Sequence, residues 1–372
     1  MPSFPNAWAE INLRALARNL RAIWKGRPQR SIIAVVKADA YGHGAVEASK
    51  RLVEEGATML AVATVAEAAE LRSAGIEAPI VLLGAYTRVD CEDILALELV
   101  PSVSSFQFAE DLDRAAGRRR VKAAVHVKID TGMGRLGIPM GSAMPAIEKI
   151  SMLPNLVLEG VYTHFASSDE EDKSFTMRQA ADFNRTISAL EGVGIKFKYH
   201  HAAASAACMD VPEAHFDTLR PGLALYGLRP TPECSKGVKL EPVMEFASRV
   251  VHVERRGAGT SIGYGRTHRL EKETLVAVIS AGYADGYDRR FSGRAVVGIN
   301  GAEAPVLGRV SMDLISVDAT AVAGVKPGDK AVLFSTDPSA PNSVERLAEL
   351  IDTIPYTLVC GVSKRVSRLY KS

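Results

Sequence analysis

The sequence has little of the features that mark several specialised classes of protein. Its 372 residues include four cysteines, and because no two of them form a CxxC pair, neither a zinc site nor a redox motif is predicted. A formal net charge of +2 excludes the strongly basic surface typical of nucleic-acid-binding proteins. No apolar run approaches the ~20 residues needed to cross a bilayer. We therefore expect no metal, nucleic-acid or membrane partner.

The same scarcity bears on where the protein works. The cysteines are Cys91, Cys208, Cys234 and Cys360, and such scattered residues suit reduced thiols in the cytoplasm. Residues 1–10 show no basic segment followed by an apolar core, so no signal peptide is predicted. We expect a cytoplasmic protein.

What the sequence does have is the pattern of a two-domain globular chain. Hydrophobic residues make up 47% and charged residues 24%, which is typical of a protein with a sizeable core. Over residues 11–238, about eight strand patterns alternate with helix patterns, which predicts a (β/α)8 barrel. A doubly wound open sheet is the alternative.

The pattern changes near Pro230 and Pro232. Beyond Gly237 the helical pattern nearly vanishes, and short valine- and isoleucine-rich runs alternate with Gly, Pro and Asp turns. This predicts a C-terminal, mainly β domain over residues 239–372, to which we assign the strand within residues 1–10. One helix is expected in it, over residues 343–351, with Ser343 as its N-cap.

The stretch 35–44 is the most informative part of the chain. An apolar run over residues 32–36 stops at Lys37, a glycine-spaced turn follows, and a helix pattern covers residues 45–55. A lysine at the end of a buried strand is desolvated, which lowers its pKa. A neutral amine can attack an aldehyde and form a Schiff base. A lysine that extends to solvent is the structural alternative.

Residues 36–44 closely resemble the pyridoxal-phosphate lysine motif of the alanine racemase family. Further family motifs follow in order, at residues 130–137, 220–227, 261–266, 282–286 and 308–313. The resemblance covers both predicted domains. It implies a barrel that binds pyridoxal 5'-phosphate, a racemase that interconverts L- and D-alanine and supplies D-alanine for peptidoglycan, and a homodimer with shared active sites.

The resemblance also assigns roles to individual residues. Lys37 and Tyr264 are the implied catalytic bases on opposite faces of the substrate. Arg135 is implied to bind the cofactor's phenolic oxygen and the substrate, and Arg220 to face the pyridine nitrogen. The other implied cofactor contacts are Tyr41, His164, Ser205, Gly222, Leu223 and Tyr356, and the other implied substrate contacts are Tyr283, Met312 and Asp313.

Two of these assignments carry a chemical expectation of their own. Arginine stays protonated, so Arg220 cannot readily give the ring nitrogen a proton, and transamination should be suppressed in favour of proton exchange. A free tyrosine has a pKa of about 10, so Tyr264 needs a neighbouring positive charge or hydrogen-bond donor to act as a base. His164 and Arg289 are the implied candidates.

Other interpretations of the same segments remain open. Residues 132–137 contain G-x-G-x-x-G, but the strand before them lies in the middle of the series, and Pro139 and Gly141 interrupt the helix that a dinucleotide fold requires. Lys128 matches a lysine that carries a carbamate in many family members, or it is an ordinary strand lysine.

This chain departs from the family pattern at four positions. They are Ala204 in place of asparagine, Gly263 in place of serine, Ser311 in place of cysteine and Thr357 in place of glutamate. Changes near the substrate entrance leave a racemase of broad specificity as an alternative. A decarboxylase of the same fold and a non-catalytic cofactor-binding barrel are further alternatives, disfavoured by Arg220 and by the β domain respectively.

Overall fold

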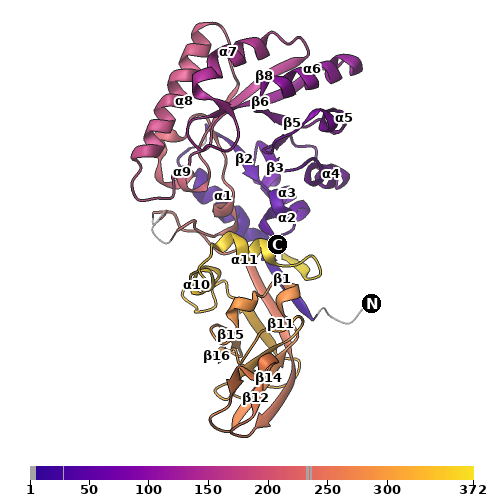
Figure 1. Ribbon diagram of the computed structural model, residues 1–372, viewed down its shortest axis with the longest axis vertical. Coiled ribbons are helices and arrows are strands. Elements are labelled where there is room, and N and C mark those ends of the chain that lie inside the picture. Colours follow the sequence, from indigo (N-terminus) through magenta and orange to yellow (C-terminus); the bar gives the residue numbers. More distant parts are fainter. Residues whose placement is uncertain (1–5, 28, 232–233, 235–236) are drawn as a thin grey trace.

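The computed structural model describes residues 6–372 except 28, 232, 233, 235 and 236. Pro232 and residues 1–5 of the predicted strand segment thus lie outside the described residues. Figure 1 shows an elongated molecule, with a barrel and its helices at one end and a β domain at the other. No helix in the described part of the chain is long and apolar enough to cross a membrane.

The barrel is a closed ring of parallel strands, as predicted. In its nine-stranded sheet the short β7 pairs only with β6, and the remaining strands close through the pairs β5–β6 and β2–β10. Its strands are β2 (Ser31–Val35), β3 (Met59–Val62), β4 (Ile80–Leu82), β5 (Val100–Val103), β6 (Ala123–Asp130), β7 (Ile138–Pro139), β8 (Leu156–Tyr162), β9 (Tyr199–His201) and β10 (Thr218–Leu219).

Helices surround this ring, and local capping explains where several begin. Asn12 accepts a hydrogen bond from the Ala15 N–H at 3.0 Å, and Ser105 accepts one from the Phe108 N–H at 3.3 Å. The helices are α1 (Leu13–Trp24), α2 (Lys37–Tyr41), α3 (Ala45–Glu54), α4 (Val65–Ser73), α5 (Cys91–Ala96), α6 (Phe106–Arg119), α7 (Met140–Ser151), α8 (Ser174–Gly192) and α9 (Ser205–Asp210). Short 3-10 turns are η1 (Arg88–Asp90), η2 (Pro212–Ala214) and η3 (Leu223–Tyr226).

The β domain is built on the long strand β11, which pairs antiparallel with β1, β14 and β18. Both β1, near the N-terminus, and β19, at the C-terminus, belong to this sheet. Its strands are β1 (Ala7–Asn12), β11 (Met244–Arg256), β14 (Thr274–Ile279), β15 (Val296–Ile299), β16 (Ala302–Pro305), β17 (Ile315–Asp318), β18 (Lys330–Phe334) and β19 (Ser367–Lys371). The hairpin β12 (Ser261–Ile262) and β13 (His268–Arg269) stands apart, and η4 (Tyr264–Arg266), η5 (Tyr283–Asp285) and η6 (Arg289–Phe291) are short turns.

The expectation of a single helix in the C-terminal half was wrong. Besides α10 (Val344–Leu350), which Ser343 caps as predicted, there is α11 (Pro355–Gly361). Proline at the first turn of a helix is well tolerated, but α11 is too short to give a helical pattern in the sequence. Figure 1 places α11 where the barrel meets the β domain.

The barrel interior has an apolar half and a polar half. The apolar half is a cluster on β2 to β5 and β9 made of Ile33, Val35, Met59, Ala61, Val81, Val100 and Tyr199. Buried polar side chains come instead from β5, β6, β9 and the strands beside them, among them Ser102, His126, Lys128, His201 and Thr218. Alternate residues of a strand point to the same face, so these side chains share the interior.

Candidate active site

A cavity of about 250 Å³ opens at the carboxyl ends of the barrel strands. Active sites of such barrels lie at this face. Among the residues predicted as functional, the cavity is lined by Lys37, Tyr41, His164, Ser205, Arg220, Gly222, Leu223 and Tyr356. The structure thus brings eight predicted residues from separate parts of the sequence around one space.

Lys37 is followed by a turn of unusual handedness. Residues Ala38, Asp39, Ala40 and Tyr41 all have φ of 53°, so α2 is a left-handed turn. L-residues pay roughly 1–2 kcal/mol each for this conformation. Gly42 ends the turn with φ of 82°, and a Cβ there would collide with the Val359 carbonyl of α11.

Two carboxylates hold this turn. Glu67, at the start of α4, accepts hydrogen bonds from the backbone N–H of Ala38 at 2.7 Å and of Ala63 at 2.7 Å. Asp39 accepts one from the Ala45 N–H at 2.7 Å, at the start of α3. The backbone beside Lys37 is therefore fixed to two neighbouring helices, which limits where its amine can go.

The environment of the cavity favours neutral amines. Burial, followed by the charge of Arg135, lowers the pKa of Lys37. Burial and the charge of Arg220 lower the pKa of Lys128 to about 8. Arg135 does not line the cavity itself, but its charge acts on both lysines. Both amines are therefore neutral at lower pH than ordinary lysines.

Arg220 is buried with 3% of its surface exposed, and two of its nitrogens are committed to the protein. Nη1 lies 2.5 Å from His201 Nδ1, while Nη2 donates to the Thr163 carbonyl at 2.9 Å and lies 3.1 Å from His164 Nδ1. Among the described residues, Nε makes no hydrogen bond. Since Arg220 lines the cavity, Nε is a donor available to a ligand.

Ser205, Gly222 and Leu223 also line the cavity. The Ser205 hydroxyl accepts from the N–H of Gly222 at 3.0 Å and of Ala224 at 3.2 Å. Gly222 also leaves room for Tyr41, because a Cβ on it would stand 2.6 Å from the tyrosine oxygen. An anion such as phosphate could accept from these N–H groups in place of the Ser205 oxygen.

The G-x-G-x-x-G segment has a local structural reason. One carboxylate, Asp130, accepts hydrogen bonds from the N–H groups of Gly132 at 2.9 Å, Met133 at 2.8 Å and Gly134 at 3.0 Å. The glycines thus shape a loop around Asp130 that carries Arg135 near the cavity.

The remaining predicted residues lie on the β domain and do not line this cavity. Tyr264 is 71% exposed, Tyr283 41% and Met312 52%. Figure 1 places β12, which precedes Tyr264, toward the end of the β domain away from the barrel. The Met312 N–H makes no hydrogen bond to any described residue. In a single chain, Tyr264, Tyr283 and Met312 are therefore accessible to solvent.

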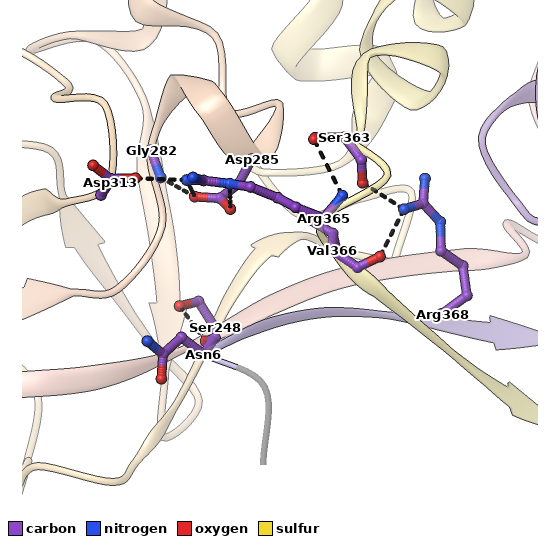
Figure 2. Close-up of polar contacts among 9 residues, drawn as sticks. All are labelled: Asn6, Ser248, Gly282, Asp285, Asp313, Ser363, Arg365, Val366 and Arg368. Carbon is purple, nitrogen blue, oxygen red and sulfur yellow. Dashed lines mark hydrogen bonds and ion pairs between the residues drawn. The ribbon is translucent and has the colours of Figure 1, made fainter. Parts of the chain in front are cut away.

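Asp313 is part of a charged cluster in the β domain. Figure 2 shows Arg365 between two carboxylates: it donates to Asp285 at 2.7 and 2.9 Å and to Asp313 at 2.7 Å. Asp285 in turn accepts from the Gly282 N–H at 2.8 Å. Arg365 thus fixes η5 and the loop with Met312 relative to each other.

Another arginine, Arg368 of β19, ties the lysine turn to this region. It donates to the carbonyls of Gly42 at 3.0 Å, Val362 at 2.7 Å and Val366 at 2.7 Å. Figure 2 shows its contacts with Ser363 and Val366. Neither Arg368 nor Glu67 was predicted from the sequence. The capping-box pattern of Thr64 and Glu67 is readable, but it does not show that Glu67 also reaches Ala38.

Both halves of the chain match one family. The alanine racemase N-terminal domain matches residues 11–230, and the alanine racemase C-terminal domain matches residues 243–370. Alanine racemase 1 of Clostridium acetobutylicum is 41% identical over 98% of this chain and 95% of its own length. The alanine racemase of Desulforamulus reducens is 43% identical over 98% of each.

Solved structures agree in fold. The alanine racemase of Clostridium difficile superposes with a TM-score of 0.95 at 36% identity, covering 99% of this chain and 96% of that one. The Bacillus anthracis alanine racemase with bound L-Ala-P gives a TM-score of 0.93 at 34% identity, covering 100% and 96%.

The barrel, the β domain and the lysine at the barrel mouth define a class of two-domain barrel isomerases. The matches extend over nearly the whole chain and over both domains. The chain belongs to the alanine racemase family.

Proposed function

We propose that the protein is a pyridoxal-phosphate-dependent racemase that interconverts L- and D-alanine with two bases. The observation that carries the proposal is the cavity that joins a half-buried lysine of lowered pKa to a buried arginine and to Ser205, Gly222 and Leu223. The proposed biological role is the supply of D-alanine for peptidoglycan. We also propose a cytoplasmic location and a boundary between the domains near residues 238 and 239.

The residues of the cavity fit the cofactor. Ser205, Gly222 and Leu223 would hold its phosphate, and the Nε of Arg220 would face its ring nitrogen. Tyr41, His164 and Tyr356 line the same space, and Arg135 stands near it. The bound cofactor supplies an aldehyde for Lys37 and a conjugated ring that makes the α-proton of an amino acid acidic.

The chain's own residues supply the proton transfer and its direction. Lys37 would take or return a proton on one face of the substrate's Cα, helped by a lowered pKa that makes the amine a base at lower pH than an ordinary lysine. Arg220 would keep the ring nitrogen unprotonated, because a guanidinium has no proton to give readily. This favours return of the proton over transfer of the amino group.

The second base requires a second chain. Tyr264 is exposed and absent from the cavity of its own chain, as are Tyr283 and the Met312 N–H. We propose a homodimer in which these residues of one subunit complete the partner's cavity. There Tyr264 would face Lys37 across the substrate, and Asp313 would border the entrance.

Isotope exchange tests the proposed reaction. The protein, loaded with pyridoxal phosphate, is mixed with L-alanine in deuterated water, and optical rotation and deuterium at Cα are followed. We expect rotation to disappear while solvent deuterium enters Cα. Deuterium entry with full retention of configuration would contradict two-base racemisation. Running the same assay on serine, arginine and lysine separates alanine specificity from the broad-specificity alternative.

A further inference from the structure

A line of hydrogen bonds runs from Arg220 into the barrel interior. Arg220 Nη1 lies 2.5 Å from His201 Nδ1, and His201 Nε2 lies 2.9 Å from His126 Nδ1. Both histidines are fully buried, with 0% of their surface exposed. His126 does not line the cavity, so it reaches the site only through His201 and Arg220.

Donor and acceptor roles determine which nitrogen of the His201 and His126 rings carries the proton. A guanidinium only donates, so His201 Nδ1 must accept, and the single proton of the neutral ring sits on Nε2. That proton is donated to His126 Nδ1, so His126 is neutral too and carries its proton on Nε2. Burial and the charge of Arg220 act the same way, lowering the pKa of His126 to about 3.

This line of hydrogen bonds ends at the N–H donor of His126 Nε2. His126 Nε2 is buried and has no hydrogen-bond partner among the described residues. Gly160 of β8 lies against the ring, since a Cβ there would stand 2.6 Å from His126 Cδ2. A buried unsatisfied N–H is unfavourable, and an apolar side chain would avoid it. The presence of a histidine at position 126 is therefore explained by the hydrogen bond that its Nδ1 accepts from His201.

His126 Nδ1 accepts the hydrogen bond that orients the His201 ring, and His201 in turn contacts Arg220. Without an acceptor at His126, the Nε2–H of His201 would be buried and unsatisfied, and rotation of that ring would take Nδ1 away from Arg220. The guanidinium would then lose the contact that holds its Nη1 in place.

We propose that His126 is a positioning residue for Arg220, acting through the tautomer and orientation of His201. The proposal rests on the proposed function, in which the Nε of Arg220 faces the cofactor's ring nitrogen. His126 itself touches neither substrate nor cofactor.

Nitrogen NMR of the full-length chain, labelled at histidine and free of cofactor, tests the hydrogen bonds directly. We expect His126 and His201 to be neutral Nε2–H tautomers, with a scalar coupling between His201 Nε2 and His126 Nδ1. His126→Asn places an amide oxygen where Nδ1 was and should keep His201 in that single tautomer. His126→Leu should give mixed tautomers or an exchange-broadened His201 signal.

Activity of the loaded enzyme then tests the consequence. Racemisation should fall about tenfold in His126→Leu and stay within about twofold in His126→Asn. The fraction of turnovers that release pyruvate, by transfer of alanine's amino group to the cofactor, should rise only in the leucine variant. An Nδ1–H or charged His126 in the unmodified chain, or equal behaviour of the two variants, would overturn the proposal.

The outcomes remain separable. If the unmodified holoenzyme does not racemise alanine, the proposed function fails, while the NMR result still reports on the hydrogen bonds. If the leucine variant does not fold, the coupling and tautomers in the unmodified chain and in His126→Asn decide the matter.

Discussion

The two proposed bases stand in opposite surroundings. Lys37 lines a cavity, its backbone is fixed by Glu67 and Asp39, and its pKa is lowered by burial. Tyr264 lies on a short turn of the β domain and is 71% exposed. The environment of Lys37 is thus complete within a single chain, whereas that of Tyr264 would be completed only in the proposed dimer. In this proposal the barrel supplies the base for one face of the substrate, and a partner subunit would supply the base for the other.

Removing either base should have the largest effect on the rate of racemisation. We expect Lys37→Ala and Tyr264→Phe each to lower racemisation by about 10²–10⁴-fold, because each loses a general acid–base group. Tyr264→Phe should still exchange the Cα proton of one enantiomer with deuterated water, since Lys37 remains, but without inversion. Proton NMR of each enantiomer measures this. Equal loss of exchange for both enantiomers would contradict one base for each face.

Because the charge of Arg135 lowers the pKa of Lys37, replacing Arg135 should change the pH at which the Lys37 amine reacts. Arg135→Leu removes a repelling positive charge and should shift the pKa of Lys37 upward, although burial keeps it below the ordinary value. In the cofactor-free protein, modification of Lys37 by trinitrobenzenesulfonate, followed by peptide mapping, should then require higher pH. Arg135→Lys keeps the charge and is the matched control. An unchanged midpoint in Arg135→Leu would count against the electrostatic explanation.

Backbone strain beside Lys37 predicts a smaller effect. Ala38 is exposed and left-handed, so Ala38→Gly should stabilise the fold by up to about 1 kcal/mol. The control is Ala181→Gly in α8, where an exposed alanine is helical and the change should destabilise by roughly 1 kcal/mol. Urea unfolding measures both. Destabilisation of the same size in both variants would mean that the turn is unstrained.

Much of the scaffold could be predicted because its signals are local. Residues 59–62 are an apolar run and residues 156–162 a mostly apolar one, and both are strands in the structure. The predicted cap at Ser343 was confirmed for the same reason. The lysine turn gave no such signal, because alanine and aspartate at positions 38–40 carry no mark of positive φ.

Contacts between distant segments account for what the sequence left open. His126 shares the strand face of Lys128, so alternation places it inside the barrel, but its partner His201 comes from another strand. Whether Tyr264 serves its own chain or another depends on an interface that no spacing encodes. The residues that line the cavity were thus predictable, whereas the pairing of Lys37 with Tyr264 stays a prediction.

Mixed dimers test whether Tyr264 of one subunit acts in the cavity of its partner. Lys37→Ala and Tyr264→Phe subunits, each inactive as homodimers, are combined with different affinity tags, and the doubly tagged dimer is purified. If Tyr264 acts in the partner's cavity, one site of each mixed dimer has both bases, and racemisation should return to about half the unmodified activity per dimer. Purified mixed dimers that stay inactive would contradict a shared active site.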